Sequence, residues 1–148
     1  MIDRFNVRVY GLLFNQNHQV LLSQEKYGNL LFTKFPGGGL EFGEGTVDCL
    51  MREFKEEFNV DIEVEKHFYT TDFFQQSAFV KTDQLLSIYY LVKCNFDNVD
   101  LRPNKMLTEK NQPEIKPFWQ KLDPGLSDAL TFPIDKLVAK LLLNSPTV

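Results

Sequence analysis

Cysteine is scarce in this chain of 148 residues, and no paired Cys or His arrangement of the kind that holds zinc is present. The two cysteines, Cys49 and Cys94, lie far apart in the sequence, and no secretory segment accompanies them. A disulfide framework is therefore not expected. Reduced thiols in a cytoplasmic protein are the simplest interpretation.

The chain also lacks clusters of lysine and arginine, and its net charge is −4. A basic patch is what tracks a nucleic-acid backbone, so binding to duplex nucleic acid is not expected. Residues 1–14 alternate in polarity and carry charge, which is typical of neither a signal peptide nor a membrane span. We therefore expect no association with a membrane.

Several catalytic signatures are missing. The glycines of residues 37–45 are not followed by Gly-Lys-Ser/Thr, which excludes a P-loop, and their spacing does not fit a dinucleotide-binding fingerprint. Nothing resembles a Ser/His/Asp series. The chemistry of this protein must therefore be sought elsewhere in the sequence.

What is present is the length of one domain, residues 1–148, with 43% hydrophobic residues. Residues 5–14 and 19–24 are β-rich and flank a turn-forming segment, which predicts a hairpin. Further strands are predicted at 61–70, 84–93 and 117–122, turns at 123–132, and an amphipathic helix at 134–144 with Ile134, Leu137, Val138 and Leu141 on its apolar face. This mixture indicates an α/β fold, a mixed sheet covered by helices.

The clearest predicted helix covers residues 47–58, with Thr46 as its N-cap. Its apolar arc is predicted to be the buried face and comprises Val47, Leu50, Met51, Phe54 and Phe58. Glu53, Glu56 and Glu57 are three and four residues apart, so they lie within contact distance on the opposite face. Such a face is often merely solvated.

Two features favour a function for these three glutamates. Like charges at this spacing repel, and no lysine is interleaved among them on that face. The glycine-rich residues 37–45 directly upstream let backbone groups approach a ligand closely. Mg²⁺ prefers oxygen ligands and would relieve the repulsion while attracting a polyphosphate.

The spacing of residues 38–60 resembles the Nudix box, G-x5-E-x7-R-E-U-x-E-E-x-G-U, where U is apolar. The matching residues are Gly38, Glu44, Arg52, Glu53, Phe54, Glu56, Glu57 and Val60. The departure is Asn59, where the family has glycine. Asparagine is the best non-glycine residue for a left-handed position after a helix, so we expect that conformation at Asn59.

The resemblance implies an α/β/α sandwich and hydrolysis, dependent on Mg²⁺ or Mn²⁺, of a nucleoside diphosphate linked to another group. It implies that Glu53, Glu56 and Glu57 hold the metal with the carbonyl of Gly38. Arg52 would orient a glutamate, and Glu44 would tie the loop to the helix. A small-molecule nucleotide is then the substrate, and homodimers are frequent in the family.

The resemblance leaves the catalytic base open between Glu53, Glu57 and a carboxylate outside the box. Family members often take such a carboxylate from the segment before a late strand, which makes Glu114 and Glu109 the candidates. The alternative function is a catalytically silent module that senses nucleotides or binds a partner. Stacking of a base on residues 73–79 or on Trp119 also stays open.

Overall fold

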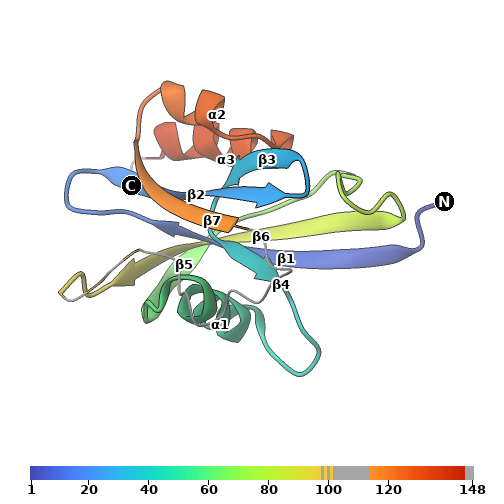
Figure 1. Ribbon diagram of the computed structural model, residues 1–148, viewed down its shortest axis with the longest axis horizontal. Coiled ribbons are helices and arrows are strands. Elements are labelled where there is room, and N and C mark those ends of the chain that lie inside the picture. Colours follow the sequence, from blue (N-terminus) through green and yellow to red (C-terminus); the bar gives the residue numbers. More distant parts are fainter. Residues whose placement is uncertain (98, 100, 102–113, 146–148) are drawn as a thin grey trace.

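Two β-sheets lie between one long helix on one side and two helices on the other (Figure 1). The structure is a computed structural model that describes residues 1–97, 99, 101 and 114–145. None of the helices in these residues is long and apolar enough to cross a bilayer. The layers confirm the predicted α/β class with a mixed sheet.

The larger sheet has four strands in the order β4 (Gly37–Gly39), β1 (Arg4–Leu13), β6 (Asp83–Cys94), β5 (Ile62–Thr70). β1 runs parallel to β6, whereas the two outer pairs are antiparallel. The sheet is therefore mixed, and the strands predicted at 61–70 and 84–93 are confirmed.

The smaller sheet is antiparallel, with the order β3 (Leu30–Lys34), β2 (Gln19–Tyr27), β7 (Glu114–Lys121). The predicted hairpin of residues 5–14 and 19–24 is wrong, because β1 and β2 belong to different sheets and meet only at a bridge between Phe14 and Val20. The turn signal correctly marks a chain reversal. It does not determine the pairing, because both edges of β1 are bonded to β4 and β6.

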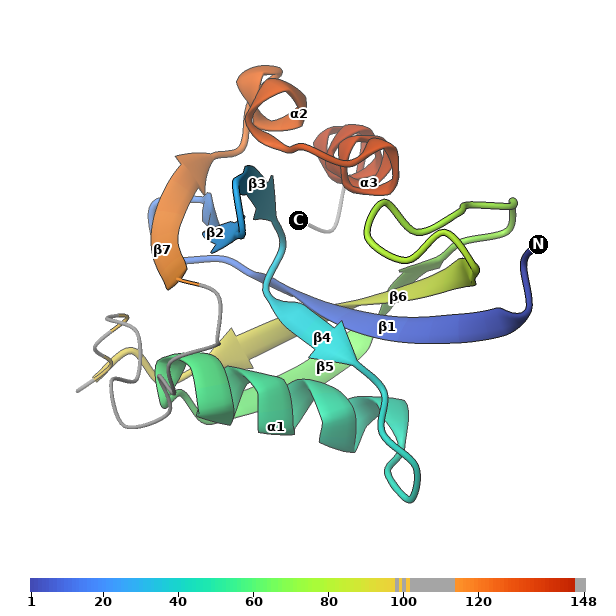
Figure 2. The ribbon, with the colours of Figure 1, turned by 45° about the vertical axis from the view of Figure 1, so that its right-hand side comes forward.

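Apolar side chains form two cores, one on each side of the strands. α1 (Thr46–Phe58) packs below the four-stranded sheet, and α2 (Gly125–Ala129) and α3 (Pro133–Leu143) pack above the strands (Figure 2). α2 lies where only turns were predicted. On α3 the predicted face is corrected, because Asp135, Ala139 and Leu142 are buried with Ile134 and Val138, whereas Leu141 is 37% exposed.

α1 begins one residue earlier than predicted. Its N-cap is Gly45, whose backbone N–H donates to the carboxylate of Asp48 over 3.3 Å. Thr46 is instead the first helical residue, and its hydroxyl lies 2.7 Å from the hydroxyl of Tyr90 on β6. Because Asp48 reaches back to the helix start, Thr46 is left to tie the helix to the sheet.

The buried face of α1 is also rotated relative to the prediction. Its fully buried residues are Cys49, Leu50, Phe54 and Phe58. Val47 and Met51 are 39% and 45% exposed. Relative to the prediction, the buried face of α1 is shifted toward the side of the helix that carries Glu53 and Glu57. These two glutamates point into the protein rather than away from it.

Asn59 ends α1 in the left-handed conformation, with φ 55° and ψ 38°, as predicted. Its backbone N–H donates to the carbonyl of Lys55 over 3.1 Å. An L-residue with a branched Cβ is strained at this φ, whereas asparagine tolerates it.

We therefore expect Asn59→Val to lower the free energy of unfolding by roughly 1–2 kcal/mol, because a β-branched side chain is strained in this conformation. Asn59→Gly is the matched control and should be neutral or slightly stabilising. Urea unfolding of the three proteins measures the difference. A valine variant as stable as the parent would show that the terminus relaxes without cost.

A buried hydrogen bond joins α3 to the four-stranded sheet. The hydroxyl of Tyr89 on β6 donates to Asp135 over 2.6 Å, and Asp135 is 3% exposed. Burial raises the pKa of Asp135 from 3.8 to about 6, although the bond from Tyr89 opposes this rise. The folded protein therefore holds a proton on this carboxyl more tightly than the unfolded chain does.

This raised pKa predicts a pH dependence of stability. Between pH 3.8 and about 6 the folded state binds more protons at Asp135, so stability must fall as the pH rises through that window. The interval corresponds to about 3 kcal/mol. Asp135→Asn removes the titration, so the stability of the variant relative to the parent should rise by about 2 kcal/mol from pH 4 to pH 7, measured by urea unfolding. Parallel curves for the two proteins would contradict it.

Candidate functional site

Arg52 lies at the centre of a network that joins α1 to the glycine-rich loop. Its Nε and Nη2 donate to the two carboxylate oxygens of Glu44 over 2.9 and 2.7 Å, and Nη2 also donates to the carbonyl of Gly39 over 3.1 Å. The bonds from Arg52 lower the pKa of Glu44 to about 2. A bidentate pair of this kind fixes orientation as well as charge, so the loop is held at a defined distance from the helix.

The remaining nitrogen of Arg52 is shared between two glutamates of α1. Nη1 donates to Glu53 over 3.1 Å and to Glu56 over 3.2 Å. The expected contact between Arg52 and Glu56, four residues apart, is therefore present. Glu56 is the more open of the two, since 49% of its side chain is exposed against 14% for Glu53.

The glycines of β4 leave room for the side chain of Glu53. A Cβ on Gly38 would overlap the carboxyl group of Glu53, so a residue with a side chain would push the glutamate away. Gly37 has a φ of 151°, and a Cβ there would collide with the carbonyl of Val9. Burial raises the pKa of Glu53, and Arg52 opposes that rise. The glycines therefore bring a carboxylate directly against a backbone strand.

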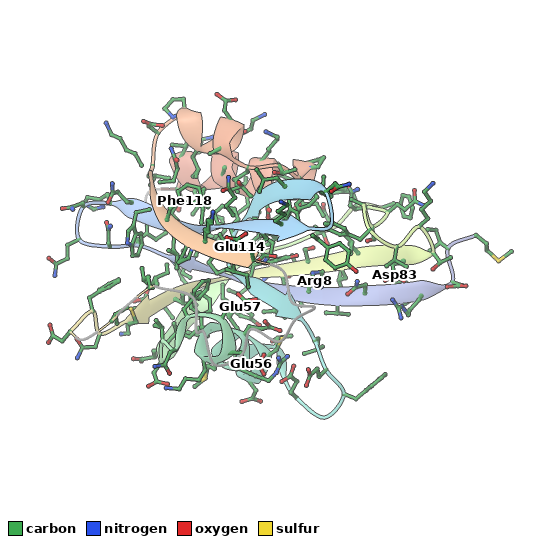
Figure 3. The ribbon with its side chains drawn as sticks, viewed as in Figure 1. Arg8, Glu56, Glu57, Asp83, Glu114 and Phe118 are labelled. Atoms are coloured by element: carbon green, nitrogen blue, oxygen red, sulfur yellow. The ribbon has the colours of Figure 1, made fainter. Side chains whose placement is uncertain are left out.

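Glu57 lies deeper, on the side of α1 that faces the sheets, whereas Glu56 lies on the side that faces away (Figure 3). Its Oε2 is buried and accepts no hydrogen bond from any residue that the structure describes. Burial raises the pKa of Glu57 to about 8, and the charge of Lys34 opposes this rise. A buried carboxylate oxygen without a partner is costly, and within the described residues this one is left open to a ligand.

The donors fit a hard divalent cation, because every one is an oxygen and their charge is negative. Among the described residues, no three His, Cys, Asp or Glu side chains are arranged to hold a metal ion by themselves. Mg²⁺ is usually held by one or two carboxylates together with waters and substrate phosphates. Glu53 and Glu57 beside the backbone of Gly38 provide such a partial set.

A buried ion pair that the sequence analysis missed lies next to Glu57. Nζ of Lys34 on β3 is 3.1 Å from Oε1 of Glu25 on β2, and each side chain is 7% exposed. The same Nζ donates to the carbonyls of Phe35 and Gly37. No signal for it was present in the sequence, because β2 is buried on both faces from Val20 to Ser23 and alternation does not single out Glu25.

A cavity of about 310 Å³ adjoins this pair. Lys34 and Glu25 line its wall on the carboxylate side, and Asp135 lines another part. Phe79, from the segment proposed for stacking, lines the cavity, and the centre of its ring lies 5.2 Å from the centre of the ring of Phe32. Trp119 is not among its lining residues and packs against Phe96 in the core below the sheets instead.

Most of the predicted site residues are brought together by α1 and the strand and loop before it. These residues are Gly38, Glu44, Arg52, Glu53, Glu56 and Glu57. Glu109 lies outside the described residues, so its role stays a prediction.

Glu114 is not brought into this group. It is the first residue of β7, is exposed, and lies 3.4 Å from Nζ of Lys116. Ile115 pairs with Glu25, and successive side chains of a strand point to opposite faces. Glu114 therefore points to the face of β7 opposite that shared with Glu25, and a role for it stays a prediction.

Comparisons with solved structures give the same fold. A MutT protein from Methanosarcina mazei superposes with a TM-score of 0.72 at 15% identity, covering 97% of this chain and 94% of that one. An ADP-ribose pyrophosphatase from Streptococcus suis gives 0.62 at 19% identity, covering 94% and 90%. A UDP-X diphosphatase gives 0.63 at 18% identity, covering 93% and 60%. At these identities the likeness concerns the fold.

No curated protein matches the sequence. The family model that matches describes a NUDIX domain and covers residues 4–141, which includes the whole of the Arg52 network and the glycine strand. The chain therefore belongs to the NUDIX family.

Proposed function

We propose that the protein hydrolyses a pyrophosphate bond in a nucleoside diphosphate linked to another group, with Mg²⁺ or Mn²⁺. The observation that carries this proposal is the buried, unpartnered Oε2 of Glu57 beside Glu53 and the glycine strand. Water adds across the P–O–P bridge. One phosphorus takes the hydroxyl group, and the bridging oxygen leaves with the other phosphate and a proton.

Each residue of the site has a proposed role. Glu53, Glu56 and Glu57 would hold the cation with the carbonyl of Gly38. The cation supplies Lewis acidity toward phosphoryl oxygens and lowers the pKa of an attacking water. Arg52 orients Glu53 and Glu56 through the bonds from Nη1.

Glu44 contributes by fixing Arg52, because both of its carboxylate oxygens accept bonds from that guanidinium. The base stays open between Glu53, Glu57 and a carboxylate outside the box. Burial raises the pKa of both Glu53 and Glu57 above the ordinary value of a glutamate, which makes each a stronger base than a solvated carboxylate.

The cavity supports a substrate with an organic group beyond its phosphates. Two structures of the same fold are, by name, an ADP-ribose pyrophosphatase and a UDP-X diphosphatase. A cavity of about 310 Å³ with aromatic walls lies beside the carboxylates and suits a planar group. We therefore place the pyrophosphate at the glutamates and the organic group in the cavity.

The test is hydrolysis of a panel of nucleotide sugars, ADP-ribose, dinucleoside polyphosphates and nucleoside triphosphates with Mg²⁺ or Mn²⁺, with products identified by mass spectrometry. Hydrolysis that stops in a chelator supports the proposal. A silent nucleotide-sensing module would bind a member of the panel and release nothing. The presence of every carboxylate of the box disfavours that alternative.

We expect Glu57→Gln to lower turnover by about 100-fold or more, which corresponds to about 3 kcal/mol of barrier. The amide keeps the shape of the side chain and removes the charge that faces the cation. Glu56→Gln should also lower turnover and weaken binding of Mn²⁺ measured by calorimetry. Glu63→Gln, an exposed change on β5, is the control. Parental turnover in both site variants would refute the metal assignment.

For the carboxylate outside the box, we expect Glu109→Gln or Glu114→Gln to lower turnover at saturating metal with little change in melting temperature. Glu114 is exposed, and an exposed carboxylate contributes little to stability, so a loss of rate in its variant would report on chemistry. Rates measured across a pH series check this. Parental rates in both variants and in the double variant would exclude this segment as a source of the base.

A further inference from the structure

Arg8 on β1 has no place in the Arg52 network, yet it lines the same cavity. Figure 3 shows it on β1, apart from the glutamates of α1. Its Nε donates to the hydroxyl of Tyr10 over 2.9 Å, and its Cζ lies 5.9 Å from the centre of that ring. Tyr10 is 8% exposed, so the contact fixes the guanidinium to a buried support.

The bond to Tyr10 uses one of the five N–H donors of Arg8. Across the described part of the chain, Nη1 and Nη2 of Arg8 donate no hydrogen bond. Neither nitrogen is among the buried side-chain atoms that lack a partner in the described residues, so both remain open to an acceptor that enters the cavity. The free edge of the fork suits a planar pair of oxygens, as in phosphate.

Arg8 differs in this respect from the other cation of the cavity wall. Nζ of Lys34 is already engaged by Glu25 and by the carbonyls of Phe35 and Gly37. Arg8 therefore offers free donors where Lys34 does not.

The position of Arg8 links β4 to the cavity. Its Nη1 lies 3.5 Å from where a Cβ on Gly39 would stand, and Arg8 lines the cavity together with Asp135. Contacts with Tyr10 raise the pKa of Arg8, and Glu53 and Glu25 add to this rise while burial opposes it. An anion beside Arg8 would thus lie next to the glycine strand and in the cavity.

We propose that Arg8 binds the phosphate group that stays attached to the organic part of the substrate in the cavity. This inference rests on the proposed function. Arg8 acts as a substrate-binding residue, and Tyr10 positions it. The cation site would then engage the other phosphate of the pyrophosphate.

The experiment is calorimetric titration of the metal-free protein, in a chelator, with AMP, GMP, CMP and UMP and with the matching nucleosides. A chelator excludes binding that is bridged by a metal. We expect the parent to bind at least one monophosphate, Arg8→Met to bind it at least tenfold more weakly, and the nucleoside to bind both proteins equally. Arg8→Lys should recover part of the affinity, and Tyr10→Phe should lose less than Arg8→Met.

Lys93→Met is the matched control, because it removes one positive charge from β6 at a side chain that is 55% exposed. It should bind the monophosphate as the parent does. Equal affinity of parent and Arg8→Met, or no monophosphate binding by the parent, would overturn the inference. If Arg8→Met fails to fold, the test uses Arg8→Lys and Tyr10→Phe. Parental affinity for the monophosphate in both of these variants would also overturn the inference.

Hydrolysis of the nucleotide panel separates this inference from the proposed function. A parent that hydrolyses with metal, beside an Arg8→Met variant with unchanged kcat/KM and monophosphate affinity, would leave the function standing and remove Arg8 from the site. A parent that binds a monophosphate through Arg8 but hydrolyses nothing would support the role of Arg8 and refute the proposed function.

Discussion

One guanidinium holds the glycine loop and the acidic helix together. Arg52 donates to Glu44, to the carbonyl of Gly39 and to two glutamates of its own helix. Without this cation Glu44, Glu53 and Glu56 would repel one another, because no other positive group is bonded to all three in the described residues. Because β4 and α1 approach each other through Arg52, the position of the glycine strand against Glu53 depends on it.

The sequence predicted α1 well, and it predicted which residues of the box the fold brings together, since both depend on local spacing. The box motif identified Arg52, the glutamates and the glycine strand, and Asn59 has the expected left-handed conformation. The buried face was the error. Helical periodicity places apolar residues on the buried face and carboxylates on the exposed face. In the structure Glu53 and Glu57 point inward, so the buried face excludes Val47 and Met51.

The two sheets and the cavity were beyond such reasoning. A turn signal after β1 cannot say that its partners come from residues 37–39 and 83–92. Arg8, Glu25 and Lys34 lie on three strands of two sheets, so no spacing in the sequence links them. Only the tertiary pairing shows that they meet.

The central pairing of β1 with β6 also governs how the site is assembled. Arg4 and Asp83, joined at one end of this parallel pair, are separated by 79 positions in the sequence. Closing so long a loop costs chain entropy before any contact offsets it, and non-local pairing of this kind slows folding. β4 and α1 leave the ribosome before β6 does. A fragment ending before Asp83 would therefore carry every residue of the box and still lack β6, the strand that lies between β1 and β5 in the sheet on which α1 packs.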